Sequence, residues 1–146
     1  MTVEVDRSFD VDATREEVWE LLADEENRAR VISVVEDYEV VDPERHEVTW
    51  HIRLPIPLIK STIAVRTWDV ERNPPGFVKF VGRSKVMNVT GEHEITSLDS
   101  GCRVRNRFVV DGKVPGVEKF FERNFDSEIE NIKRAVSERV GAVEEA

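Results

Sequence analysis

The strongest constraint on the fold is a long amphipathic segment near the end of the chain. Between residues 117 and 140, apolar side chains recur three or four positions apart and so form one stripe along a helix. The stripe consists of Val117, Phe121, Phe125, Ile129, Ile132, Val136 and Val140, and Phe120 widens it. At about 1.5 Å per residue, the predicted helix is more than about 30 Å long. It can cover a whole face of a small sheet, so the preceding residues are expected to provide that sheet.

Those preceding residues predict seven strands and two short helices. Residues 3–11 alternate between apolar and polar side chains, which is typical of a strand with one buried face. Thr14 and Glu17 then have the spacing of a capping box at a helix start, and Asp24 can cap a second short helix. Residues 34–111 predict six more strands between turn sequences, the third strand of the chain being residues 47–54 and the fourth starting near Ile59. The fold class is therefore α+β, in a single domain of residues 1–146.

The last two strands can be aligned from their side-chain pattern alone. Pairing Ile95 with Val104 puts the apolar rows of both strands on one face, and a slip of one residue would turn one row outward. This register places Glu94 opposite Arg105 and Glu92 opposite Arg107 on the outer face, where opposite charges are favourable. It also places His93 opposite Asn106 on the inner face.

Four segments of the sequence resemble a known group of proteins. The residues "DATREEVWELLADEE" resemble the start of the START/SRPBCC superfamily, the polyketide cyclase/dehydrase and lipid-transport group. The segments "LPIPLIKSTI", "PPGFVKFVG" and "GCRVRNRFVV" are similar to its carbon monoxide dehydrogenase G-like branch. The resemblance implies a helix-grip fold, in which a curved seven-stranded antiparallel sheet wraps around the C-terminal helix, with two short helices after the first strand. In many members, the space between them holds a lipid, quinone, sterol or polyketide.

Three polar residues fall on rows that are expected to face inward: Arg7, His93 and Asn106. A buried charge without a partner is costly, so Arg7 needs a carboxylate, a ligand or a route to solvent. In a functional interpretation, His93 and Asn106 orient a ligand carbonyl or hydroxyl, and Arg7 attracts an acidic group. In a structural interpretation, the three residues form a buried cluster whose hydrogen bonds are all satisfied, or Arg7 reaches solvent at the sheet edge.

Large apolar side chains on the inward rows are the other candidates for ligand contacts. A set of aromatic residues with a few polar groups suits a site for an apolar or aromatic ligand, although core packing is the alternative for each one. The predicted set is Tyr38, Trp50, Ile52, Met87, Phe108, Phe121 and Phe125.

The loop from Leu54 to Ile59 is unusually apolar for a connection between strands. An exposed apolar segment usually marks an interaction site, so the loop is expected either to close the mouth of the cavity or to make a transient contact with a protein or membrane.

Charge and composition exclude several classes of function. The net charge of -9 disfavours nucleic acid, and the single cysteine excludes an internal disulfide. The N-terminal residues lack the pattern of a signal peptide, so a cytoplasmic location is expected. With 15 Arg, six Lys and 24 Val, the composition resembles that of proteins from salt-loving organisms, and a moderately acidic mesophilic protein is the alternative.

Together these features predict binding or carriage of a hydrophobic or aromatic small molecule in an internal cavity. No metal ligand spacing or phosphate-binding loop is present, so neither a metal nor a cofactor is expected. The alternatives are a cyclase or dehydratase that uses His93 and Arg7, and an assembly factor for a larger enzyme. A monomer or weak dimer is expected.

Overall fold

The computed structural model describes residues 2–57 and 59–145, with side chains described as far as residue 138. Leu58 in the apolar loop and the side chain of Val140 in the apolar stripe therefore lie outside the described residues. The elements follow the chain in the order β1 Thr2–Val11, α1 Arg15–Leu22, α2 Glu25–Val31, β2 Val35–Asp42, η1 Pro43–Arg45, β3 Glu47–Ile52, β4 Ile63–Asn73, β5 Phe77–Arg83, β6 Met87–Ser97, β7 Cys102–Gly112 and α3 Val117–Glu145.

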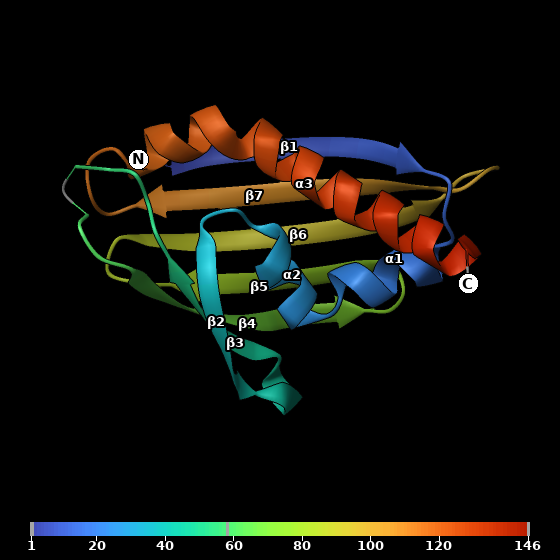
Figure 1. Ribbon diagram of the computed structural model, residues 1–146, viewed down its shortest axis with the longest axis horizontal. Coiled ribbons are helices and arrows are strands. Elements are labelled where there is room, and N and C mark those ends of the chain that lie inside the picture. Colours follow the sequence, from blue (N-terminus) through green and yellow to red (C-terminus); the bar gives the residue numbers. More distant parts are fainter. Residues whose placement is uncertain (1, 58, 146) are drawn as a thin grey trace.

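The described strands form one antiparallel sheet of seven strands, in the order β1-β7-β6-β5-β4-β3-β2. Helix α3 crosses β1 and β7 diagonally, and α1 and α2 lie on the same face of the sheet (Figure 1). Strands β1 and β2 are the two edges of the sheet. This is the helix-grip arrangement, and it confirms the predicted α+β fold.

Both short helices begin where the capping residues predict. The Thr14 hydroxyl accepts a hydrogen bond from the Glu17 backbone N–H at 3.2 Å, and the Glu17 carboxylate accepts one from the Thr14 N–H at 3.3 Å. The Asp24 carboxylate accepts from two free N–H groups at the start of α2. These bonds satisfy backbone donors that have no partner within the helix, and so they determine where each helix begins.

The predicted register of the last hairpin is confirmed. Ile95 pairs with Val104, and His93 lies opposite Asn106. Of the two expected outer-face ion pairs, the one between Arg107 and Glu92 forms, at 3.1 Å. Arg105 turns instead to Asp6 on β1, because β7 lies between two strands that both present carboxylates.

The fourth strand begins four residues later than predicted, at Ile63. The apolar stripe of α3 is buried against the sheet as predicted, from Val117 through Phe121, Phe125, Ile129 and Ile132 to Val136. The core therefore lies between α3 and the concave face of the sheet, and this is where a ligand site has to be sought. Among the described residues, no helix is long and apolar enough to span a membrane.

Candidate ligand cavity

A small apolar cavity lies between the sheet and α3. Its volume is about 40 Å³, and its wall surface is apolar. The lining comes from β3, β5, β6, β7, α3 and the turn of residues 32–34, and comprises Ile32, Val34, Trp50, Ile52, Phe80, Met87, Val89, Phe108, Val110, Phe121, Phe125, Glu128 and Ile132. Sites for drug-sized ligands usually measure about 300–1,000 Å³. A ligand of several rings therefore enters only if the walls move apart.

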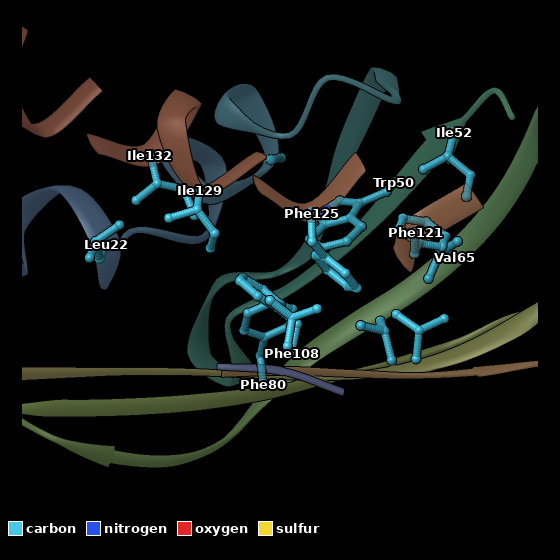
Figure 2. Close-up of a cluster of buried hydrophobic side chains, with 14 of the residues drawn as sticks. Leu22, Trp50, Ile52, Val65, Phe80, Phe108, Phe121, Phe125, Ile129 and Ile132 are labelled. Carbon is cyan, nitrogen blue, oxygen red and sulfur yellow. The ribbon is translucent and has the colours of Figure 1, made fainter. Parts of the chain in front are cut away.

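The walls are held together by interlocking aromatic rings, several of which are visible in Figure 2. Trp50 meets Phe80 edge to face with ring centroids 5.8 Å apart, and Phe108 of β7 stacks on Phe125 of α3 at 5.8 Å. Phe121 lies 5.7 Å from Phe125 along the same helix. Such contacts are individually weak, about 0.5–1.5 kcal/mol beyond the area that they bury. A flat apolar molecule could replace these ring–ring contacts with contacts of its own, at a small cost in free energy.

Six of the predicted ligand residues line this cavity: Trp50, Ile52, Met87, Phe108, Phe121 and Phe125. Val89 and Val110 also line it, and the alternation of their strands could have identified them because they share the inward rows of Met87 and Phe108. Ile132 belongs to the stripe of α3. No sequence signal marks Glu128, which lines the cavity from the edge of that stripe while its carboxylate is bonded to Ser33.

Arg7 does not line the cavity, which corrects the expectation from the sequence. Its backbone is paired with Asn106, on the row that was predicted to face inward. However, β1 is an edge strand, and the side chain is 54% exposed, with its Nε 3.2 Å from a carboxylate oxygen of Asp126 on α3. The arginine therefore reaches solvent at the sheet edge, as the structural interpretation of this residue proposed.

His93 and Asn106 form a closed pair beneath the cavity instead of lining it. The His93 Nδ1 lies 2.8 Å from the Asn106 Oδ1, and the Asn106 amide donates to the backbone oxygens of Arg7 and Val104. The His93 ring packs against Phe80 and Phe108, which do line the cavity. Burial lowers the pKa of His93 to about 4, so the ring is neutral near pH 7.

Tyr38 also lies away from the cavity, on the edge strand β2. Its hydroxyl is 3.4 Å from a carboxylate oxygen of Glu26, and the Arg30 guanidinium lies 5.6 Å from the centre of its ring. The tyrosine is partly buried at the margin of the core and packs against α2, which covers that end of the sheet.

A buried ionic cluster next to His93 was not predicted. Arg28 of α2 is 4% exposed and forms an ion pair with Asp69 of β4, and Arg72 donates to the same carboxylate at 2.6 Å. Burial lowers the pKa of Arg28, and the carboxylate of Asp69 opposes that shift. The Arg28 guanidinium also lies 5.0 Å from the ring centre of Phe80. This cluster anchors α2 to the sheet and supports one wall of the cavity.

The turn of residues 32–34 separates the cavity from an outer groove. Ile32 and Val34 line the cavity, and Val34 also lines the groove, together with Ser33, Glu36, Arg53, Leu54, Pro55 and Ile59. The turn is joined to α3 by Glu128, whose carboxylate accepts from the Ser33 N–H at 3.0 Å and from the Ser33 hydroxyl. This Ser33–Glu128 joint therefore lies between the cavity and the groove.

The loop of residues 54–59 forms the opposite wall of that groove, and its most apolar side chains point inward. Leu54 is 1% exposed and Ile56 is 8% exposed, while Pro55 and Pro57 face solvent. Among the described residues of the loop, Leu54 and Ile56 thus belong to the core and are not exposed to a partner. The loop borders the groove through Leu54, Pro55 and Ile59.

The fold and the cavity together define a helix-grip protein with an apolar interior between its sheet and its long helix. A family model described as polyketide cyclase/dehydrase and lipid transport matches residues 2–137, and the chain belongs to this family. The expected membership of the START/SRPBCC superfamily is thus confirmed, while the finer similarity to the carbon monoxide dehydrogenase G-like branch stays a prediction.

Solved structures with the same fold cover nearly the whole chain. A conserved protein from Geobacillus kaustophilus is 16% identical with a TM-score of 0.76, and 96% of each chain is covered. The Zhui aromatase/cyclase from Streptomyces sp. R1128 is 16% identical with a TM-score of 0.75, again with 96% of each chain covered. A START superfamily protein from Mycobacterium smegmatis is 11% identical with a TM-score of 0.74, covering 96% of this chain and 98% of its own. No curated protein matches the sequence.

Proposed function

We propose that this protein binds and carries a hydrophobic or aromatic small molecule between its sheet and α3. The observation that supports this most directly is the apolar, aromatic-walled cavity, which is separated from an outer groove by a single short turn. A ligand that displaces the ring contacts of Phe108, Phe121 and Phe125 would replace one set of apolar contacts by another. The cavity thus expands around its ligand and closes when the ligand leaves.

Catalysis of a cyclase or dehydratase type has less support from the geometry. A general base must lie within hydrogen-bond reach of its substrate, and His93 is separated from the cavity by Phe80 and Phe108. Its lowered pKa also makes it a weak base near pH 7. Arg7, the other candidate, points to Asp126 and solvent.

A contact with a membrane or an enzyme partner would use the surface beside the groove. Since Leu54 and Ile56 are buried, the described residues of the loop that remain available to a partner are Pro55, Pro57 and the partly buried Ile59. We propose this surface as the place where a ligand would be handed over.

A blocking substitution tests the carrier function. Val110→Phe places a ring in the cavity and should reduce binding of the neutral fluorescent probe N-phenyl-1-naphthylamine at least about tenfold, because the ring and the probe need the same space. Val109→Phe, at the adjacent outward position of β7, is the matched control and should leave binding unchanged. Native mass spectrometry of the gently purified protein would identify a natural ligand. If wild-type protein neither co-purifies with an apolar molecule nor binds the probe, the carrier function is wrong.

A further inference from the structure

The indole N–H of Trp50 is a buried donor without an acceptor. Trp50 is 4% exposed and lines the cavity, and its Nε1 is enclosed with no hydrogen-bond partner among the described residues. Buried donors in proteins almost always have a partner, and one left unpaired is destabilising. The cavity wall exposes no polar atom, so this N–H lies behind the wall, on a residue that lines the cavity. A donor in this state beside a cavity indicates a group that gains an acceptor when a ligand parts the wall.

The remaining lining restricts what that ligand can be. Among the described lining residues, Glu128 carries the only charged side chain, and it is an anion. With no cation among these lining residues, a buried carboxylate or phosphate on the ligand would have no counter-charge there. An uncharged oxygen acceptor, such as that of a ketone, quinone or ester, can accept from the indole without this penalty.

We propose that Trp50 selects the ligand, by donating its indole N–H to a neutral acceptor oxygen on an otherwise apolar ring compound. This rests on the proposed function, because the ligand must first enter the cavity. As the rings of Trp50, Phe80 and Phe125 part to admit it, the indole becomes part of the enlarged wall. Trp50 is then a specificity-determining residue, and a ligand that would bury a carboxylate in the cavity is disfavoured.

Two probes of nearly equal shape separate the hydrogen bond from apolar contact. Fluorene and 9-fluorenone differ in one carbonyl oxygen, and equilibrium dialysis measures the Kd of each. We expect wild-type protein to prefer fluorenone, and Trp50→Phe to lower that preference roughly fivefold, which is typical for the loss of one hydrogen bond. Replacement of Trp50 by 3-benzothienylalanine, which keeps the bicyclic shape without the N–H, should do the same if Trp50→Phe folds poorly. Trp68→Phe, outside the cavity lining, is the control.

The indole proton gives a direct second readout. In ¹H–¹⁵N spectra, the Trp50 indole resonance should move downfield with fluorenone and not with fluorene, since only the carbonyl accepts from it. If both probes bind and the preference for fluorenone is the same with and without the Trp50 N–H, the role of Trp50 is overturned while the carrier function stands. If neither probe binds, both proposals fail.

Discussion

At the scale of single residues, burial of His93 decides its charge and thereby makes stability depend on pH. The ring is fully enclosed by Phe80, Phe108 and Asn106, and burial is the largest cause of its lowered pKa, with the Arg28 guanidinium adding to it. A protonated imidazolium would have to be desolvated in this position without a carboxylate beside it. The histidine is therefore a neutral structural group that holds β6 to β7.

His93 makes the free energy of unfolding depend on pH. Its pKa is about 4 in the folded protein and about 6.5 in the unfolded chain, so the unfolded chain binds more protons between these values. The resulting stability is complete above about pH 6.5 and is lost as the pH falls through 4, to a total on the order of 3 kcal/mol. His93→Gln keeps a donor for the Asn106 oxygen but cannot titrate. Urea unfolding at pH 7 and pH 4.5 should show a smaller loss in this variant than in wild type.

The control for this experiment is His51→Gln, at a partly exposed position of β3. It should retain the pH dependence of the wild-type protein. Equal losses of unfolding free energy in wild type and His93→Gln would show that His93 does not carry a lowered pKa.

At the scale of elements, the contact between the 32–34 turn and α3 lies between the cavity and the outer groove. The turn follows α2 and precedes β2, and its backbone is held to the sheet by the bond from the Arg53 N–H to the Val34 oxygen at 2.9 Å. Its attachment to the helix is the Ser33–Glu128 joint. Hydrogen bonds to a carboxylate are stronger than those between neutral groups, yet two of them can break locally without unfolding the sheet.

We predict that weakening the Ser33–Glu128 joint speeds ligand exchange. Ser33→Ala removes one donor and Glu128→Gln removes the charge, and each should raise both the association and the dissociation rate of N-phenyl-1-naphthylamine several-fold, up to about tenfold. Because the two rates rise together, Kd should change less than either rate. Glu130→Gln, at an exposed position of the same helix, is the matched control in stopped-flow fluorescence. Unchanged rates in both joint variants would mean that the ligand enters elsewhere.

At the scale of the whole molecule, the acidic surface is organised by the strand order. Three arginines on the outer face of β7 each pair with a carboxylate on β1, so Arg103, Arg105 and Arg107 form a ladder with Asp10, Asp6 and Glu4. These pairs are about half exposed, and exposed pairs contribute little each. The net charge of -9 therefore acts mainly as a general self-repulsion on the folded protein.

Added salt should raise the thermal stability of this protein. At about 1 M salt the Debye length falls to about 3 Å, which screens the repulsion between surface carboxylates more than it weakens the core. We expect the midpoint of thermal unfolding to rise steadily between low and molar potassium chloride, as calorimetry would measure. Sucrose at equal osmolality is the control for effects of water activity. A flat response to potassium chloride would favour an ordinary acidic protein over one adapted to salt.

Much of the architecture could be predicted because it depends on neighbours in the sequence or on paired strands. The register around Ile95 and Val104 follows from alternation, since a slip would expose one apolar row. The capping residues Thr14 and Asp24 accept hydrogen bonds from backbone N–H groups that lie only three positions further along the chain. The apolar stripe of α3 identifies the one face of the helix that must be buried.

The candidate site was predicted less completely, because facing inward is not the same as lining the cavity. Arg7 and His93 lie on the predicted rows, but Arg7 is at a sheet edge and His93 is covered by two phenylalanine rings. Neither circumstance follows from alternation. The buried Arg28 could not be predicted because its partner Asp69 is 41 residues away, on a strand that only the fold brings near.

By itself, then, the sequence determined the elements, their inward faces and the pairing of the last hairpin, since these follow from periodicity and from charge between adjacent strands. Only the tertiary structure decided the size of the cavity, its aromatic closure and its separation from the outer groove. Those depend on where α3 crosses a curved sheet, and on contacts such as Ser33 with Glu128, 95 residues apart. Contacts between residues so far apart in the sequence arise from the packing of whole elements, and local side-chain patterns do not encode them.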